Sequence, residues 1–507
     1  MPKPIAGMPS AVKVAPPALK RAKLVDLVCF TGVMAASRLA LRSHYLYDLD
    51  SVNFALALRK SDVAVHQPHP PGYFLYVCLG RLFLRFFPDP NTALVAISIL
   101  ASCGFVVLLY FLTDQWFGRR AARWAGLLLL VSPLAWFHGI VALTYIVEGF
   151  LSACLGYLCW QAWSGRAGFV APSALLFAAS VGFRQSSALL LGPLWLLSLR
   201  RARRREAAWG LVVLGVSVLA WLIPMLIASG GVERYWTSLH GLWTLVPGRQ
   251  NALAGFFAST VARIFVILGI LLFCFGVSAL LVSVDTPSFG RDAHRFLLAW
   301  IAPALLFFSL VFLKSVNSGY LLIVTPPLFA WMGAKVAAWM STPVRRAVAL
   351  AGAGVNTALF LFAPFYCSYR SVRQVEGELA SIPPEVRRLA DPRDTLVVSF
   401  DSHFLGFRHA AYYLPEYLTL EYPAARFPYG RRIFAARDRN TLLLEQPPTQ
   451  VFRNFVIFPL PDEPSFHEYL REFARSFPGG RLESRTSGTR SYLVGRAEDL
   501  PVLFPNR

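Results

Sequence analysis

The sequence has 507 residues, of which 56% are hydrophobic and only 15% charged. Soluble domains usually carry about 25% charged residues, so this composition excludes an ordinary soluble enzyme and indicates a protein that crosses a membrane many times. The formal net charge of +21 lies almost entirely before residue 367, as 30 basic against 11 acidic residues. We interpret this excess as membrane topology and not as a nucleic-acid-binding surface.

Apolar runs long enough to cross a hydrocarbon core of about 30 Å recur through the first 366 residues. We expect about eleven membrane-spanning helices. They are expected at residues 24–41, 92–112, 121–138, 142–160, 168–183, 186–199, 208–228, 260–284, 296–313, 319–338 and 347–366. A shorter helix at 73–87 carries Arg81 and Arg85, and we expect it to lie at the membrane interface.

Basic residues precede the first apolar run, which places residues 1–23 in the cytoplasm. No small-residue cleavage site follows that run, so we expect a retained helix and not a signal peptide. The first loop, residues 42–91, is then extracytoplasmic, and the arginine-rich stretch 200–205 is cytoplasmic. The sequence thus predicts a multi-pass protein of the inner (plasma) membrane.

Residues 367–507 are balanced in charge, with 19 basic against 17 acidic residues, and are expected to form a small α/β domain outside the membrane. Strands are predicted at 394–400, 417–422, 454–460 and 490–496, and a helix at 404–414. The predicted fold is therefore an α-helical polytopic membrane domain, residues 24–366, followed by this extracytoplasmic domain. Most cysteines lie in apolar runs, so we predict no structural disulfide.

The first loop contains the stretch SHYLYDLDSVNFALALRKSDVAVHQPHPPGYF, with Asp48 and Asp50 soon after the first helix. A carboxylate beside a membrane is costly unless it is solvated or paired, so both are functional candidates. The alternatives are a solvated loop and a helix cap, and Asp50 precedes a helical pattern that it could cap. Asp62 is interpreted as a solvated charge. His66 and His69 are either satisfied polar groups or substrate ligands, because a metal site would need a third ligand.

The order of these features resembles the GT-C class of membrane glycosyltransferases, in particular the bacterial relatives of protein O-mannosyltransferases and aminoarabinose transferases. An acidic pair follows the first helix, an amphipathic stretch comes next, and HPPGY opens the second helix. Residues 132–150, 181–197 and 317–330 are similar to further segments of this group. The resemblance covers residues 24 to 366 and is most specific over 43–87. The class often has Asp-Glu where this chain has Asp50-Ser51.

Enzymes of this class transfer a sugar from a polyprenyl phosphate lipid to an acceptor at the outer face of the membrane. The reaction needs a base for the acceptor and a cation for the departing phosphate. The resemblance implies Asp50 as the catalytic base, with Asp48 as its partner or substitute, and Arg184, helped by Lys314 or Arg234, at the phosphate. Substrate-binding residues are expected to be His66, His69, Tyr73, Glu148, Arg184, Gln185 and Tyr320.

Structural interpretations of the same residues stay open. Arg184 ends a predicted helix and could simply extend to the membrane interface, and Glu148 could pair with an arginine. For the whole chain the alternatives are a transporter or flippase of lipid-linked sugars, which typically shows internal repeats that are not found here, and a non-catalytic membrane scaffold.

The expected partners are a polyprenyl-phosphate-linked sugar donor, membrane lipid and an acceptor that the sequence does not identify, with no nucleic acid. The acceptor is a lipid, a glycan or a protein. No protein-built metal site is predicted, and the use of a divalent cation, Mg²⁺ or Mn²⁺, is left open by the change from Asp-Glu to Asp50-Ser51.

Overall fold

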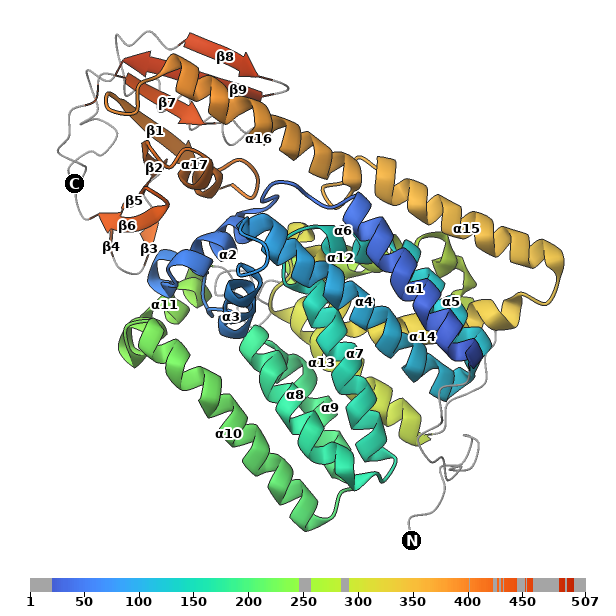
Figure 1. Cartoon of the computed structure of the whole chain (residues 1–507). Helices are drawn as coiled ribbons and strands as arrows, with labels where there is room; N and C mark the ends of the chain where they lie inside the picture. Colours follow the sequence, from blue (N-terminus) through green and yellow to red (C-terminus); the bar gives the residue numbers. More distant parts are fainter. Residues whose placement is uncertain are drawn as a thin grey trace. The chain divides into compact units, whose positions relative to one another are not determined.

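The computed structural model describes residues 21–245, 257–283, 291–400, 402–422, 426–427, 430–431, 433–444, 452, 454–458, 483–487 and 490–496. The contacts divide the chain into two compact units (Figure 1). The helical unit comprises Met1–Arg42, Tyr73–Met225 and Val246–Arg370, and the sheet unit comprises Ser43–Gly72, Leu226–Leu245 and Ser371–Arg507. Most of the predicted cytoplasmic N-terminus, residues 1–20, lies outside the described residues.

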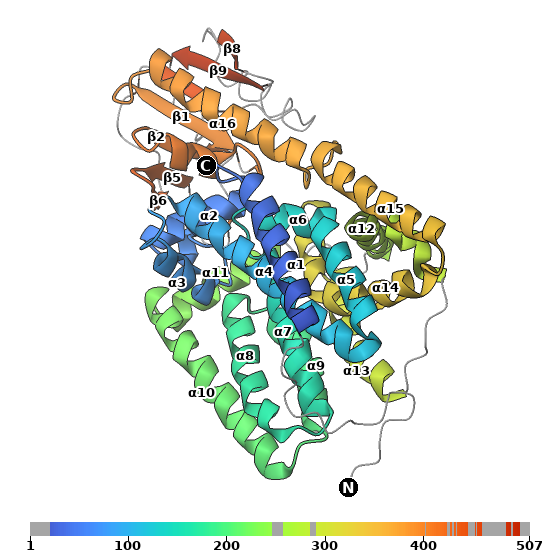
Figure 2. The same cartoon turned by 45° about the vertical axis from the view of Figure 1, so that its right-hand side comes forward.

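Each predicted apolar helix has a helical counterpart in the helical unit (Figure 2). The helices are α1 (Arg21–Ala40), α3 (Phe74–Phe83), α4 (Pro90–Phe117), α5 (Arg119–Val131), α6 (Pro133–Ile140), α7 (Tyr145–Trp163), α8 (Val170–Phe183), α9 (Ser187–Leu199), α10 (Arg204–Ala228), α12 (Phe257–Phe275), α13 (Arg291–Leu310), α14 (Thr325–Trp339) and α15 (Pro343–Phe362). The 3₁₀ segments η2 (Ala167–Phe169), η4 (Gly276–Ser283) and η5 (Ser315–Val324) lie beside α8, α12 and α14.

Within the described residues, six helices are long and apolar enough to cross a membrane, or seven if the bent pair α6 and α7 forms one span. The chain is therefore a helical protein of the multi-pass membrane type. The expected number of about eleven spans stays a prediction, because α8 and α9 are apolar but short and α1 carries several charges.

Helix caps explain several boundaries. Asp89 accepts the backbone N–H of Thr92 at 2.8 Å and precedes Pro90, a residue that favours the first position of a helix. Ser132 and Pro133 likewise begin α6, which divides the predicted helix 121–138 in two. The chain then bends by 114° between α6 and α7. This bend positions the N-terminal turn of α7.

Close packing in the helical unit depends on small residues, as is common between membrane helices. Helix α14 packs against α5 at Gly333, where an added Cβ would lie 2.7 Å from the carbonyl oxygen of Ala121 and from the backbone nitrogen of Ala125. Gly156 of α7 similarly leaves room for the ring of Trp300, whose Nε1 donates to Ser152 Oγ at 2.9 Å. These contacts fix how the helices approach one another.

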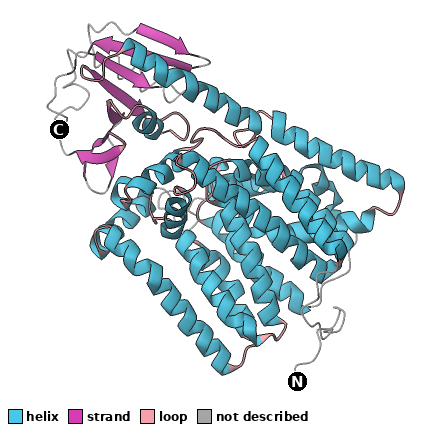
Figure 3. Ribbon diagram, viewed as in Figure 1, coloured by secondary structure: helices cyan, strands magenta, loops and turns pink. Residues whose placement is uncertain are grey.

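The sheet unit contains the strands of the molecule that the structure describes, shown in magenta in Figure 3. Its helices are α2 (Leu49–Arg59), α11 (Val232–Leu245), α16 (Tyr369–Leu389) and α17 (Phe407–Tyr413), with the 3₁₀ turn η1 (Val63–Val65). Its strands are β1 (Thr395–Phe400), β2 (Leu418–Tyr422), β3 (Arg426–Phe427), β4 (Gly430–Arg431), β5 (Ile433–Arg437), β6 (Asn440–Leu444), β7 (Asn454–Phe458), β8 (Glu483–Ser487) and β9 (Arg490–Arg496).

Seven strands form one sheet in the order β6-β5-β2-β1-β7-β9-β8, and β3 pairs with β4 separately. Strand β1 is parallel to both β2 and β7, and α17 connects β1 to β2. The strands β1, β2, β7 and β9 and the helix α17 occur where the sequence predicts them, although residues 459–460 lie outside the described part. Helix α16 has no counterpart among the predicted elements, and it continues through Pro383 and Pro384.

The first loop contributes to the core of the sheet unit. Val65 of η1 is buried in one cluster with Phe407, Ala411, Phe434 and Ala436. A second cluster joins α16 to β1 and β7. The segment that carries the acidic pair is therefore packed within the same unit as the C-terminal sheet.

Candidate active site

Asp48 is the N-cap of α2. Its Oδ1 accepts the backbone N–H of Asp50 at 2.9 Å, and its backbone is extended, as is usual at this position. Asp50 lies in the first turn of the helix, so the interpretation of Asp50 as the cap is wrong by two residues. A negative charge in the first turn is favoured by the partial positive charge of the helix N-terminus. The two carboxylates are thus held in a fixed relation by α2.

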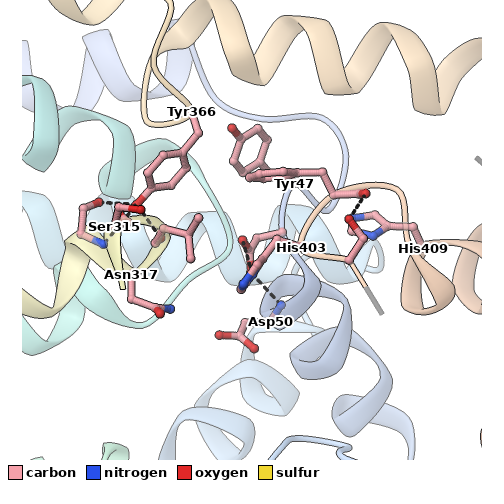
Figure 4. Close-up of polar contacts among 12 residues, drawn as sticks. Tyr47, Asp50, Ser315, Asn317, Tyr366, His403 and His409 are labelled. Atoms are coloured by element: carbon pink, nitrogen blue, oxygen red, sulfur yellow. Dashed lines mark hydrogen bonds and ion pairs between the residues drawn. The ribbon is translucent and has the colours of Figure 1, made fainter. Parts of the chain in front are cut away.

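Each aspartate lies beside a different histidine. Figure 4 labels one residue of each pair, Asp50 and His403. Asp50 Oδ1 lies 3.1 Å from His69 Nδ1. Asp48 Oδ2 lies 3.8 Å from His403 Nδ1, and the backbone N–H of Leu49 donates to the carbonyl of His403 at 2.9 Å. The Asp48 residue is buried, with 7% of its surface exposed. We call Asp48, Asp50, His69 and His403 the carboxylate cluster.

Burial raises the pKa of Asp48 to about 6, and the nearby charge of Asp50 acts in the same direction. The charge of His403, the hydrogen bond from the Asp50 backbone and the charge of His69 partly oppose this shift. Two carboxylates this close do not ionise independently. Near neutral pH the cluster therefore contains a carboxylate whose pKa is close to the surrounding pH.

The backbone that leads into α2 is tied to the C-terminal segment of the same unit. The backbone N–H of Leu46 donates to the hydroxyl of Tyr413 at 2.8 Å, and the Leu46 carbonyl lies 3.1 Å from His409 Nε2 (Figure 4). Burial lowers the pKa of His409 to about 4, so this imidazole is neutral at physiological pH. The position of Asp48 is fixed by contacts that need no charge.

His66 is partly exposed in the sheet unit and lies near enough to His69 and Asp50 for their charges to act on its pKa. Its ring lies against Phe434, with centroids 5.7 Å apart. Burial lowers its pKa to about 3, and Arg408 adds to the effect. Arg408 donates to the carbonyl of Val65 at 2.8 Å and to Thr441 at 2.9 Å. Arg408 is thus held by hydrogen bonds within the sheet unit, and its charge acts on His66.

Asp62 is not a simple solvated charge. Its Oδ1 accepts the backbone N–H of Ala64 at 3.1 Å and thus caps η1, and its Oδ2 lies 2.9 Å from Arg234 Nη2. Arg234, expected to help at the phosphate, is therefore paired within the sheet unit. Lys314, the other expected helper, is exposed at the start of η5 in the helical unit.

In the helical unit, Arg184 is buried and paired. Its Nη1 donates to Glu148 Oε1 at 2.7 Å, and their side chains are only 8% and 5% exposed. The hydroxyl of Thr144 donates to the same Glu148 oxygen at 2.9 Å. A buried charge pair in a membrane unit is costly unless well satisfied. The interpretation of Arg184 as an interfacial side chain is therefore wrong.

Aromatic rings surround the Arg184 guanidinium. Its central carbon lies 4.0 Å from the ring centroid of Tyr320, 5.3 Å from that of Tyr145 and 5.7 Å from that of Tyr73. Such contacts stabilise a cation where water is scarce. The structure thus brings together four expected site residues, which with Tyr145 we call the arginine cluster: Tyr73, Tyr145, Glu148, Arg184 and Tyr320.

Further polar groups adjoin the arginine cluster. Asn317 Nδ2 donates to the Tyr145 hydroxyl at 3.3 Å, and the hydroxyl of Tyr366 donates to the carbonyl of Ser315 at 3.0 Å (Figure 4). Gln185, in contrast, is directed to Met225 Sδ at 3.4 Å. Gln185, an expected substrate-binding residue, and Asn317, which was not a candidate, thus have different surroundings.

Across the residues that the structure describes, no group of three or more His, Cys, Asp and Glu side chains is arranged to bind a metal ion. In the carboxylate cluster, each carboxylate lies beside one histidine nitrogen, at 3.1 and 3.8 Å. In this arrangement the residues do not fit Mg²⁺ or Mn²⁺, which prefer several oxygen ligands around one point. Our proposed mechanism therefore contains no metal step.

No family model matches the sequence, and no curated protein matches it. Solved structures are similar. ArnT from Cupriavidus metallidurans bound to undecaprenyl phosphate has a TM-score of 0.60 and 13% identity, over 95% of this chain and 98% of that one. Apo ArnT gives 0.59 and 13%, over 96% and 100%. An oligosaccharyltransferase of Archaeoglobus fulgidus gives 0.44 and 13%, over 79% and 65%.

The chain has the ArnT fold. Nearly the full length of both chains is matched, so the likeness includes the sheet unit as well as the helices. The resemblance to aminoarabinose transferases is thus confirmed for the fold. An identity of 13% supports no statement on activity.

Sequence reasoning missed His403, Thr144, Tyr145 and Asn317. A signal for His403 was available, because it follows the carboxyl end of β1, a strand with parallel neighbours on both sides. Polar residues after such strands commonly form sites. Thr144 and Tyr145 lie at the bend between α6 and α7, within the segment 132–150 that resembles the group, but neither was singled out there as a site residue.

Proposed function

We propose that this chain is an integral membrane glycosyltransferase. It moves a sugar from a polyprenyl-phosphate-linked donor to a lipid, glycan or protein acceptor on the extracytoplasmic face of the plasma membrane. The ArnT fold supports this class, and one of the ArnT structures contains undecaprenyl phosphate, which is the product that such a donor leaves behind.

The observation that carries the proposal is the pair Asp48 and Asp50 at the start of α2. An asparagine would cap this helix as well as an aspartate does, yet a buried carboxylate with a raised pKa occupies the position. Groups kept in such an unfavourable state are concentrated at functional sites. The pair is therefore better explained by chemistry than by folding.

Asp50 is the base in the proposed mechanism. The acceptor O–H or N–H gives its proton to the Asp50 carboxylate as the acceptor atom bonds to the anomeric carbon of the donor. The bond between that carbon and the phosphate oxygen breaks, and its electron pair stays on the phosphate. The products are the glycosylated acceptor, polyprenyl phosphate and a protonated Asp50, which returns its proton to water.

Asp48 and the histidines position this base. Asp48 fixes the backbone of Asp50, and His69 lies 3.1 Å from the Asp50 carboxylate. A neighbouring group at this distance restricts the rotation of the carboxylate.

Arg184 is assigned to the leaving phosphate, where negative charge develops as the glycosidic bond breaks. A guanidinium has five N–H donors, and Glu148 occupies one of them at 2.7 Å. The arginine cluster holds the guanidinium in place without occupying every N–H donor. This role is separate from that of Asp50, and it is tested separately.

The experiment is a product assay on the purified protein in liposomes made with a lipid extract that contains polyprenyl-phosphate sugars. We expect release of free polyprenyl phosphate and a sugar-modified acceptor, both measured by mass spectrometry, with heat-treated protein as the control. Movement of the intact donor across the bilayer without its cleavage would identify a transporter or flippase instead. If neither reaction is observed, the non-catalytic scaffold is the better interpretation.

A further inference from the structure

Helices α9 and α13 of the helical unit enclose an open groove of about 570 Å³ (both helices are labelled in Figure 1). Pro193, Leu196 and Leu197 of α9 and its C-cap residue Arg200 line it, and they share one face because they are spaced by three or four residues. Helix α13 lines it in the same way from Arg295 to Leu306. Two continuous helix faces therefore form the walls.

The two helices run antiparallel, and both arginines lie at one end of the groove. Arg201, next to the C-terminal end of α9, forms an ion pair with Asp292 in the first turn of α13. Arg200 and Arg295 are thus the charged end, and Pro193 and Leu306 the opposite, apolar end.

The charged end keeps a positive excess. Arg201 is paired with Asp292 and also lies over the ring of Trp163, 4.2 Å from its centroid. Arg295 is 3.8 Å from the same Asp292, and its side chain is 69% exposed. Arg200 is exposed and forms no ion pair with any residue that the structure describes. The charged end therefore holds three guanidiniums and one carboxylate, which pairs with two of them.

The rest of the groove is apolar. Leu196, Leu298 and Leu306 are 58%, 65% and 58% exposed, and Ala299 and Ala302 lie between the larger side chains along α13. The span from Arg295 to Leu306 is about 16 Å at 1.5 Å per residue. This is about half of a hydrocarbon core of roughly 30 Å, which is the depth of a single leaflet.

We propose that this groove binds one anionic phospholipid. An acyl chain lies along the leucines, and the phosphate of the headgroup lies between Arg200 and Arg295. The arginine-rich stretch 200–205 is predicted to be cytoplasmic, so the lipid belongs to the cytoplasmic leaflet, whose anionic lipids attract such clusters. A groove of one leaflet's depth fits a phospholipid acyl chain better than a long polyprenyl chain. The site shares no residue with the arginine cluster or the carboxylate cluster.

Native mass spectrometry of the full-length protein in detergent tests this proposal, with phosphatidylglycerol as the probe and phosphatidylcholine as the zwitterionic comparison. We expect one tightly bound phosphatidylglycerol per chain. The double variant Arg200→Gln and Arg295→Gln should weaken its binding by about 25-fold, from roughly fivefold for each arginine. The matched control is Arg204→Gln and Arg205→Gln, which removes the same charge from the predicted same face but not from the groove.

A groove-filling variant, Ala302→Trp, tests the acyl chain without a change of charge, and it should displace the lipid. Both sets of variants replace residues that are not fully buried, and the thermal transition of each shows whether the fold is retained. Equal losses in the two arginine pairs would overturn the proposal in favour of diffuse attraction. Full binding by Ala302→Trp would overturn the placement of the chain. Undecaprenyl phosphate is added as a third probe. If the groove variants lose its binding but keep that of phosphatidylglycerol, the groove belongs to a different lipid.

Discussion

The side chain of Asp48 accepts the backbone N–H of Asp50 at 2.9 Å, so one carboxylate of the pair begins the helix that carries the other. The cap sets the position of Asp50 relative to the backbone of α2. His69 then lies 3.1 Å from Asp50, and His403 lies 3.8 Å from Asp48. The division of roles between the two aspartates follows from this geometry.

Asp48→Asn should stabilise the protein at neutral pH. The folded-state pKa of Asp48 is about 6, against an ordinary value of 3.8. The folded state thus holds the proton more tightly than the unfolded chain. The contribution of Asp48 to the free energy of unfolding therefore decreases as the pH rises from 3.8 to about 6. The resulting cost at neutral pH is about 3 kcal/mol. Asparagine keeps the cap and has no charge to bury.

The measurement is the thermal midpoint in detergent from pH 4 to pH 8. Compared with the wild type, Asp48→Asn should show a higher midpoint at pH 7.5 and a smaller decline between pH 4 and 6. Asp391→Asn is the control, because Asp391 is exposed and its side chain accepts the backbone N–H of Arg393 at 2.8 Å, which an asparagine can also do. A lower midpoint at pH 7.5 for Asp48→Asn would mean that the carboxylate itself stabilises the fold.

The buried pair of Glu148 and Arg184 is expected to show strong coupling. Arg184→Gln leaves the Glu148 carboxylate buried without its cation, which should cost about 3–5 kcal/mol of stability. The double variant Glu148→Gln and Arg184→Gln removes both charges and should recover most of that loss. Thermal unfolding of the two single variants and the double variant measures the coupling.

The same double variant separates structure from function. If Arg184 acts on the leaving phosphate, the double variant stays inactive although it is folded. A double variant that regains both stability and turnover would restrict the pair to a structural role. Arg204→Gln, which removes an exposed charge from the start of α10, should leave turnover unchanged.

Gly333→Leu should separate α14 from α5. Backbone atoms of Ala121 and Ala125 lie 2.7 Å from the position of the new Cβ, and backbone cannot rotate away as a side chain can. Overpacking of this kind typically costs about 1–3 kcal/mol or more. Gly354→Leu is the control, since nothing lies within 4 Å of its Cβ position. Equal thermal midpoints for both variants would contradict the observed packing.

The apolar helices could be predicted from the sequence. A chain in lipid must form its backbone hydrogen bonds within helices, and each such helix appears in the sequence as a long apolar run. The cap at Asp48 was misassigned to Asp50, since both precede the same apolar pattern and differ only in backbone conformation. Tyr73, Glu148 and Tyr320 were expected in one site with Arg184, and a pairing of Glu148 with an arginine was one interpretation, but the contacts themselves join three distant segments and depend on the fold. The place of His403 depends on how the sheet unit folds around the first loop.

The predicted topology has its own test. In a variant without the exposed native thiols of Cys29 and Cys78, a cysteine introduced at Lys60 should react with a membrane-impermeant maleimide from outside intact cells. Lys60 is exposed at the end of α2. A cysteine at Arg203, whose side chain is 90% exposed, should react only after the membrane is permeabilised. The opposite pattern would place the carboxylate cluster in the cytoplasm.

The turnover of Asp50→Asn is the most direct test of the proposed mechanism. The substitution preserves size and removes basicity, and a general base typically contributes about 10²–10⁴-fold. We expect release of polyprenyl phosphate to fall at least about 10²-fold while the variant still shows a cooperative thermal transition, and Asp391→Asn keeps full turnover. Full turnover by a folded Asp50→Asn would contradict the assignment of Asp50 as the catalytic base.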